Sequence, residues 1–347
     1  MDKKDEIILQ QLDVIRTMTE NNLSRMGTDF WGQPKAAKPV KEVKPEEVKK
    51  VPKAEGKAEE PEEKVEVAPP EKIEDLLSEL DGYVGLAMIK EEVRSLINMV
   101  QVYKLRQEHG LPTLDMSLHM VFSGNPGTGK TMIARLMARV YHSLGILSKG
   151  QLVEVDRSGL VAGYVGQTAI KTQKVIDKAM GGVLFIDEAY ALNGKSENDF
   201  GQEAIDTLLK AMEDHRDDLV VIVAGYTELM EAFVHSNPGL ESRFNRFLLF
   251  EDYKPEELMD IFRMRCKKGL YEVSEDAEPL IRDYIVEENG DGETFGNGRG
   301  VRNIFENILV AQNNRLAKME KVTKEDLMLL TADDVLHARG KIDESEV

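Results

Sequence analysis

The sequence predicts an α/β fold, in which helices cover both faces of a parallel sheet, followed by a smaller all-helical domain. Short apolar runs alternate with longer stretches of helical periodicity over residues 73–252. Such alternation is typical of βαβ units, whose crossover helices pack on both faces of a sheet. Strand patterns then stop, and residues 255–337 show helical spacing only. We therefore expect an α/β domain over residues 73–252 and a helical domain over residues 253–347.

The N-terminal part differs from the rest in composition. Apolar residues from Ile8 to Met18 recur on one side of a helix, so residues 1–33 are predicted to contain a short amphipathic helix. Residues 34–72 hold seven of the twelve prolines of the chain, among alternating Lys and Glu. This composition buries too little apolar surface to become ordered, so it predicts a disordered linker.

The overall composition excludes several classes of protein. The formal net charge of −18 argues against general affinity for nucleic acid or anionic lipid, because neutralising phosphates requires clustered Lys and Arg. Cys266 is the single cysteine, which excludes an intrachain disulfide and a cysteine-cluster metal site. No apolar run approaches the length of a membrane span, and the N-terminus lacks a signal-peptide core. We therefore expect no membrane span and a cytoplasmic location.

The expected strands are short and apolar. They are Met120–Ser123, Leu152–Val155, Val183–Ile186, Leu219–Ala224 and Phe247–Phe250. In a parallel sheet of this kind, ligands bind outside the carboxyl ends of the strands. The residues that directly follow Ser123 and Ile186 are therefore the first candidates for a functional site.

The most informative motif follows the first expected strand. Residues 124–131 read GNPGTGKT and match the phosphate-binding loop GxxxxGK[ST], with a helix pattern after it. Backbone N–H groups of such a loop, and the positive end of the helix, point at phosphate oxygens. Lys130 is expected to reach the β and γ phosphates, and the Thr131 hydroxyl to ligate Mg²⁺. The expected nucleotide contacts are Gly124, Asn125, Pro126, Gly127, Thr128, Gly129, Lys130, Thr131 and Met132.

A second motif, VLFIDEAY at residues 183–190, is an apolar strand that ends in two carboxylates. Asp187 is expected to hold Mg²⁺ through water, and Glu188 to orient and polarise the attacking water. Two adjacent acids can instead form an exposed turn, but the phosphate loop 56 residues earlier favours the catalytic interpretation. A glutamate directly after the metal-binding aspartate indicates ATP hydrolysis rather than the chemistry of simple GTPases.

With these motifs, the chain resembles AAA+ ATPases, and more narrowly the CbxX/CfqX group, which includes stage V sporulation protein K and red-type Rubisco activase. The resemblance covers roughly Leu80 to Leu316 and implies a P-loop AAA+ sheet domain with a C-terminal helical lid. It implies ATP and Mg²⁺ as cofactors, a homo-oligomeric ring expected to be a hexamer, and a helix over Asp199–Met212. Further segments that carry it are LDGYVGLAMIKEEV (80–93), VEVDRSGLVAGYVGQT (153–168), DFGQEAIDTLLKAMEDHRDDLVVIVAGY (199–226), NPGLESRF (237–244) and FGNGRGVRN (295–303).

The resemblance also implies roles for residues outside the two motifs. Val84 and Gly85 would border the adenine. Arg299, in GNGR, matches the second sensor, which reaches from the lid to the phosphates of its own subunit. The pore loop that grips an extended peptide is matched by Tyr164, Val165 and Gly166.

Two roles stay open at this point. Arg243, in NPGLESRF, matches the arginine finger that a neighbouring subunit inserts against the γ phosphate, and Arg246 is the alternative. Many relatives have an asparagine as the first sensor, and here Tyr226 or Thr227 follows the strand in its place.

These features predict an ATP-hydrolysing, chaperone-like remodeller that pulls on a protein client through a ring. The alternative is an ATP-dependent switch or assembly scaffold, related to sporulation or secretion, in which turnover is incidental. A small-molecule kinase would need an acceptor pocket in place of an aromatic pore loop, and the charge of −18 disfavours a nucleic-acid translocase. The client and its pathway cannot be read from these motifs.

Overall fold

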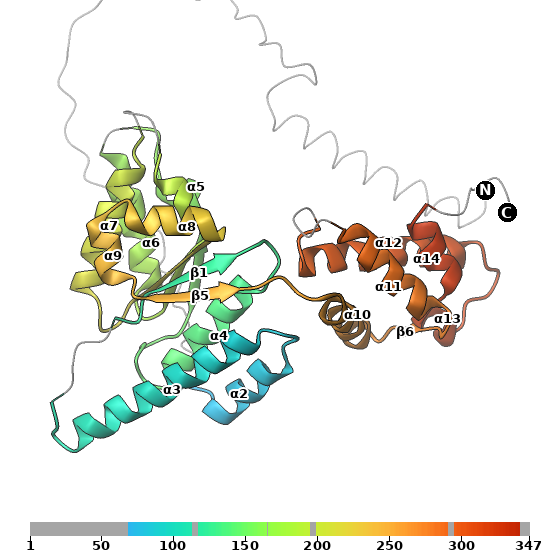
Figure 1. The fold of residues 1–347 in the computed structure, drawn as a ribbon, viewed down its shortest axis with the longest axis horizontal. Helices are drawn as coiled ribbons and strands as arrows, with labels where there is room; N and C mark the ends of the chain where they lie inside the picture. The colour runs from blue at the N-terminus through green and yellow to red at the C-terminus, as the bar shows by residue number, and fades with distance from the viewer. Residues whose placement is uncertain (1–68, 113–116, 165, 195–198, 291–294, 341–347) are drawn as a thin grey trace, which may run out of the picture. The chain divides into compact units, whose positions relative to one another are not determined.

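The computed structural model describes residues 69–112, 117–164, 166–194, 199–290 and 295–340. The predicted N-terminal helix and all but the end of the predicted linker lie outside these ranges. Within the described residues, an α/β part is followed by a helical part, as expected (Figure 1).

A parallel sheet forms the centre of the α/β part, with the strand order β2-β3-β4-β1-β5. All five expected strands are present. One lies one residue further along the chain than expected, and two others are longer by one residue. The strands are β1 (Met120–Gly124), β2 (Leu152–Val155), β3 (Val183–Ile186), β4 (Val220–Gly225) and β5 (Arg246–Phe250).

Helices connect these strands and cover both faces of the sheet. They are α2 (Ile73–Gly82), α3 (Ala87–Glu108), α4 (Lys130–Ser143), α5 (Arg157–Leu160), α6 (Gln167–Ala179), the 3-10 helix η1 (Ala189–Leu192), α7 (Gly201–Asp214), α8 (Thr227–His235) and α9 (Pro238–Arg243). Successive strand residues point to opposite faces, so Phe122 packs with α2 to α4, and Val121 packs with α6 to α8. Figure 1 shows the two helical layers on either side of β1 and β5.

The expected start of one helix was wrong. The helix predicted from Asp199 begins at Gly201, because the Asp199 side chain stays outside it. Its Oδ1 accepts hydrogen bonds from the Gly201 N–H at 2.8 Å and from Arg157 at 2.7 Å. Aspartate side chains that bond to nearby backbone N–H groups favour turns over helix interiors.

The C-terminal part is not purely helical, so this expectation also needs correction. Two short strands, β6 (Glu272–Val273) and β7 (Leu329–Leu330), pair in parallel. Two-residue strands are too short to leave an alternating pattern, which is why the sequence did not reveal them. The helices are α10 (Pro255–Gly269), α11 (Ala277–Glu288), α12 (Gly298–Ala317), α13 (Lys324–Met328) and α14 (Ala332–Ala338). All of them except α13 contribute buried side chains to a separate apolar core.

His119 is buried directly before β1. Its Nδ1 accepts a hydrogen bond from the Val221 N–H at 3.0 Å, and its ring packs edge-on against Phe244. A nitrogen that accepts a hydrogen bond carries no proton, so the imidazole is neutral. Burial lowers the pKa of His119 to about 4, although its bond to the Met212 backbone opposes this shift and the nearby Arg243 charge adds to it.

We predict that this histidine makes the fold sensitive to acid. In the unfolded chain, His119 takes up a proton near its ordinary pKa of 6.5, whereas the folded protein resists protonation until about pH 4. The stabilisation is therefore complete above pH 6.5 and declines toward pH 4, by about 3 kcal/mol in total. In His119→Asn, an amide oxygen can accept the same N–H without titrating, and we expect that variant to lack this decline.

The measurement is urea unfolding of both proteins at several values from pH 7 to pH 4. The difference in their unfolding free energies should narrow as the pH falls. If the two pH profiles run parallel, the buried histidine does not cause the acid sensitivity.

Candidate functional site

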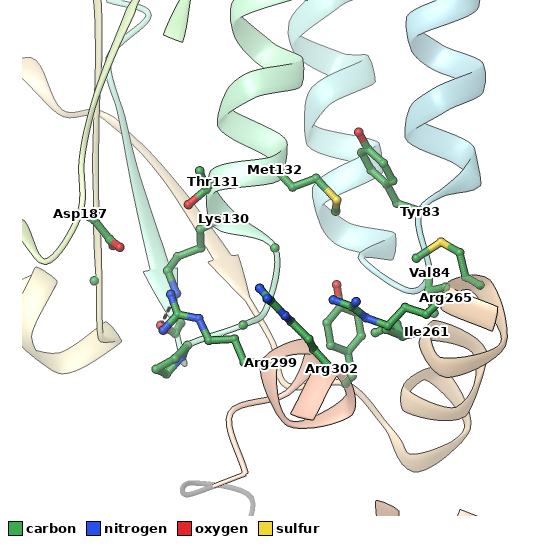
Figure 2. Close-up of a pocket in the computed structure, with 18 of the residues that line it drawn as sticks. Tyr83, Val84, Lys130, Thr131, Met132, Asp187, Ile261, Arg265, Arg299 and Arg302 are labelled. Carbon is green, nitrogen blue, oxygen red and sulfur yellow. Dashed lines mark hydrogen bonds between the residues drawn. The ribbon is translucent and has the colours of Figure 1, made fainter. Parts of the chain in front are cut away.

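A cavity of about 750 Å³ lies at the carboxyl edge of the sheet, between the phosphate loop and the helical part. This volume is typical of sites that enclose a small molecule. Figure 2 shows its lining, with Lys130, Thr131 and Asp187 at one end and Val84, Ile261 and Arg265 at the other. The expected residues that line it are Val84, Gly124, Pro126, Gly127, Gly129, Lys130, Thr131, Met132, Asp187, Glu188, Tyr226 and Arg299.

Three other expected residues lie beside the cavity without lining it. The Thr128 side chain is fully buried, and its hydroxyl donates to the Asn125 carbonyl at 2.8 Å. The Asn125 amide donates to Asp252 at 2.8 Å. A Cβ on Gly85 would lie 2.7 Å from the Glu257 carboxylate of α10, so this glycine permits a close approach of the helical part. All three support the shape of the cavity.

Lys130 begins α4 and lies over the phosphate loop. Its Nζ donates hydrogen bonds to the carbonyls of Gly124 and Asn125, both at 2.8 Å. Burial lowers the pKa of Lys130 to about 8, while the charge of Asp187 raises it and that of Arg299 lowers it. A bound phosphate would favour the charged ammonium, so this lysine is suited to an anionic ligand.

The two carboxylates after β3 reach the same cavity because the chain turns sharply between them. In a continuing strand, neighbouring side chains would point to opposite faces. Glu188 instead has φ = 50° and ψ = 42°, a left-handed conformation that is unfavourable for a residue with a side chain. Both Asp187 and Glu188 consequently line the cavity. Backbone strain of this kind is concentrated at functional sites.

The oxygen atoms near Lys130 fit Mg²⁺. Thr131 contributes a hydroxyl and Asp187 a carboxylate to the same end of the cavity, and Mg²⁺ prefers few protein oxygens together with water and phosphate. Among the described residues, no group of three or more His, Cys, Asp or Glu side chains could hold a metal by itself. A magnesium ion at this position would therefore depend on the ligand's own phosphates.

Arg157 holds the turn that carries Glu188. It donates to the Ala191 carbonyl at 2.6 Å and to Asp199 at 2.7 Å, so it joins η1 to the start of α7. Arg157 itself belongs to α5, after which the chain runs to Tyr164. Arg157 thus connects the turn after Glu188 with the segment that leads to Tyr164.

The loop before α12 contacts the back of the phosphate loop. Asn297, which is 3% exposed, accepts the Tyr253 N–H at 2.9 Å and donates to Asp252 at 2.7 Å and to the Pro126 carbonyl at 3.4 Å. The Gly298 N–H donates to the Gly127 carbonyl at 3.1 Å. A Cβ on Gly127 would lie 2.2 Å from a carbonyl oxygen of this loop, so the close approach requires glycine. We call these contacts the lid clasp.

The helical part supplies several arginines to the cavity. Val301, Ile304 and Ile308 of α12 face the core, whereas Arg299 and Arg302 line the cavity, as the helical spacing predicts. The Arg299 guanidinium has no hydrogen bond or ion pair with any described residue, although the Arg299 backbone N–H donates to the Gly296 carbonyl at 3.0 Å. The sequence did not identify the other lining residues that are distant from the two motifs along the chain. These are Tyr83, Tyr253, Ile261, Met264, Arg265, Lys268 and Arg302.

The remaining expected residues lie elsewhere. Tyr164 is 74% exposed, Gly166 caps the start of α6 with φ = 75°, and Val165 lies outside the described residues. Arg243 ends α9, away from the cavity lining of its own chain, and Arg246 begins β5. Of the two candidates after β4, Tyr226 lines the cavity, whereas Thr227 is absent from its described lining. None of the described helices is both long and apolar enough to cross a membrane.

Comparisons with known proteins agree with this geometry. The model of the ATPase family associated with various cellular activities (AAA) matches residues 120–252, and that of the AAA lid domain matches residues 254–345. Stage V sporulation protein K of Bacillus subtilis is 41% identical over 265 residues, which cover 76% of this chain and 82% of that protein. The chloroplastic ribulose bisphosphate carboxylase/oxygenase activase of Cyanidioschyzon merolae is 43% identical over 271 residues, 77% of this chain and 92% of that protein.

Solved structures support the fold. The AAA domain of FIGL-1 in complex with ADP aligns with a TM-score of 0.52 and 20% identity, over 80% of this chain and 94% of that domain. At this identity the match shows a shared fold only.

We predict that Asn297→Asp opens the lid clasp. The substitution keeps the shape and the acceptor oxygen, but it places a carboxylate against Asp252 where an amide now donates. We expect a loss of about 2 kcal/mol in unfolding free energy and weaker binding of adenine nucleotide, because the cavity loses its closing wall. Chemical unfolding and titration calorimetry measure the two effects.

The matched control is Asn303→Asp, which makes the same change on an exposed position of α12. If both variants lose stability and affinity equally, the added charge rather than the clasp is responsible.

Proposed function

Because this chain belongs to the AAA ATPase family, in the group of stage V sporulation protein K and the CfxQ proteins, it is an ATP-hydrolysing enzyme, and we propose that it remodels a protein client as a hexameric ring. The observation that carries the proposal is a division of the motif residues. The phosphate loop, both carboxylates and Arg299 line one cavity, whereas Tyr164 and Arg243 lie outside it. The first group suffices to hold ATP, and the second lies outside this cavity, where it can meet other chains.

In this proposal ATP lies along the cavity with its phosphates on the loop. Backbone N–H groups of residues 124–131 and the Lys130 ammonium hold the phosphate oxygens. Arg299 approaches the same end of the cavity, since its charge lowers the pKa of Lys130. The adenine is bordered by Val84 and Met132, with Ile261 of the lid on the other side. Closure of the lid on ATP would then depend on the lid clasp and on Arg299 together.

Hydrolysis requires a positioned water and stabilised charge. Thr131 and Asp187 would hold Mg²⁺, which neutralises charge that develops on the phosphates. Glu188 orients the attacking water and accepts its proton, a role for which its strained turn aims it into the cavity. Tyr226 lines the cavity and packs against Tyr190 with ring centroids 6.3 Å apart, so we assign the first sensor to Tyr226 rather than to Thr227.

The surroundings of the two candidate fingers favour Arg243. Its ion pair with Glu213, at 3.1 Å, joins a side chain that is 27% exposed to one that is 63% exposed, and such surface pairs are weak. Arg243 can therefore leave this pair for a neighbour's phosphate. Arg246 instead contacts the Met99 sulfur at 3.2 Å. That contact with α3 suits a structural residue.

The Tyr164 loop has the features of a grip on an extended peptide. The ring is exposed, and added Cβ atoms on the flanking Gly163 and Gly166 would meet nothing within 4 Å. An aromatic side chain on an open loop can pack against any sequence, because apolar contact has no direction. The name of the relative ribulose bisphosphate carboxylase/oxygenase activase states that it acts on an enzyme, which is a protein. We propose a protein client for this chain too. A cytoplasmic location stays a prediction.

We predict that Glu188→Gln traps the client. The amide cannot accept a proton from water, so we expect turnover to fall at least about 100-fold while ATP binding persists. In a lysate of the cells that make this protein, the variant held in ATP should retain a protein partner. The ADP-bound variant and the double variant Glu188→Gln, Tyr164→Ala should not retain it. Affinity capture followed by mass spectrometry makes the comparison.

A scaffold would behave differently. If ATP binding alone is sufficient for function, cells that carry the Glu188→Gln variant keep full activity of this protein. Capture of a protein partner then does not depend on Tyr164. That result would favour the ATP-dependent switch over the remodeller.

We predict that Arg243 acts on the ATP of a neighbouring subunit. Lys130→Ala should be inactive because it lacks a functional nucleotide site, and Arg243→Ala because it lacks the finger. In mixed rings, an intact nucleotide site of one variant meets an intact finger of the other. Random mixing of equal amounts should therefore restore up to about a quarter of the parent turnover per subunit, since the interface joins two different surfaces.

Arg246→Ala mixed with Lys130→Ala serves as the comparison. If this pair restores turnover and the Arg243 pair does not, Arg246 is the finger. If neither Arg243→Ala nor Arg246→Ala loses activity by itself, hydrolysis does not require an arginine from a neighbouring subunit.

A further inference from the structure

One face of α10 carries two kinds of side chain into the cavity. Ile261, Met264, Arg265 and Lys268 recur at helical spacing, and all four line the cavity. Ile261 and Met264 are apolar and can pack against a nucleobase, whereas Arg265 and Lys268 are positively charged. Arg302 of α12 lines the same region, and we call Arg265, Lys268 and Arg302 the lid cations.

The lid cations are incompletely neutralised. Arg302 donates to Glu306 at 2.6 Å, but the Arg265 guanidinium has no hydrogen bond or ion pair with any described residue. Burial lowers the pKa of Arg265, the charge of Arg302 lowers it further, and Glu306 opposes this. Within the described part of the chain, Glu306 is the one carboxylate that interacts with these cations. The Arg265 side chain is half-buried, whereas those of Lys268 and Arg302 are exposed. A half-buried guanidinium beside another cation is unfavourable unless an anion joins them.

ATP by itself does not supply that anion. Its phosphates form one chain, which the phosphate loop holds at the end of the cavity with Lys130 and Asp187. Figure 2 shows Arg265 beside Val84 and Ile261, at the opposite end, with Arg302 between Arg299 and Arg265. A nucleotide whose base lies against these apolar side chains brings its ribose, rather than its 5′ phosphates, toward the lid cations.

We propose that the lid cations bind a second phosphate group, carried on the ribose of an adenine nucleotide whose 5′ phosphates rest on the phosphate loop. The inference rests on the proposed function only in needing a nucleotide in this cavity. A guanidinium offers two parallel N–H donors to a phosphate, and Lys268 adds a point charge. Because this ligand would occupy the ATP site without being ATP, it would compete with ATP and hold the ring in an unproductive state.

The test is titration calorimetry of the full chain with ADP, 2′-phospho-ADP and 3′-phospho-ADP at one ionic strength. We expect one of the phosphorylated forms to bind about tenfold more tightly than ADP, as one charge-assisted phosphate contact allows. The quantity of interest is the ratio of its affinity to that of ADP. In Arg265→Gln this ratio should fall to about one, whatever the variant does to ADP itself.

Lys267→Gln is the matched control, because it removes one charge from α10 at an exposed position outside the described lining. It should keep the ratio. Equal affinities for all three nucleotides would overturn the proposal, and so would an equal fall of the ratio in both variants, which would indicate general attraction to a basic lid. Failure of the parent to bind ADP at all would instead contradict the nucleotide site.

Discussion

The structure depends on hydrogen bonds that the carbonyl groups of the phosphate loop accept from the lid side. Three successive carbonyls, of Pro126, Gly127 and Thr128, accept hydrogen bonds from the Asn297 amide, the Gly298 N–H and the Tyr253 hydroxyl. With the carbonyls paired to the lid, the N–H groups remain for an anion. The phosphate loop therefore binds the lid through its carbonyl groups and can bind an anion through its N–H groups. A movement of the lid would change the positions of these N–H groups directly.

The catalytic edge adds a second constraint. A left-handed residue between strand and 3-10 helix brings neighbouring carboxylates into one cavity, at a cost that the surrounding contacts must offset. Arg157 provides such contacts, since it holds η1 and the Asp199 turn at once. Because Arg157 also precedes Tyr164 by seven residues, its hydrogen bonds to Ala191 and Asp199 connect the Glu188 turn with the segment that leads to the proposed client grip.

Local charge differs sharply from the charge of the whole chain. The sequence carries a net charge of −18, yet the cavity collects Lys130, Arg299 and the lid cations. Long-range attraction to polyanions is therefore weak, while a compact anion inside the cavity meets several cations at short range. This contrast allows a strongly acidic protein to offer a positively charged site to a compact anion.

Local patterns in the sequence determined the five strands, the two-part organisation, and the assignment of the phosphate loop and the carboxylate pair. Each of these is contained in a short run such as GNPGTGKT or VLFIDEAY, whose spacing alone specifies the backbone and the chemistry. The two-residue strands β6 and β7 and the start of α7 were missed or misplaced, since they depend on contacts rather than on periodicity.

Only the tertiary structure decided which distant side chains complete the site. Asn297 and the Pro126 carbonyl are separated by 171 residues, and Tyr253 and Thr128 by 125. It also placed Tyr226, but not Thr227, in the described lining of the cavity, together with Arg265, Lys268 and Arg302. No spacing along the chain encodes these contacts, because they arise where a helical lid packs against a loop formed much earlier in the sequence.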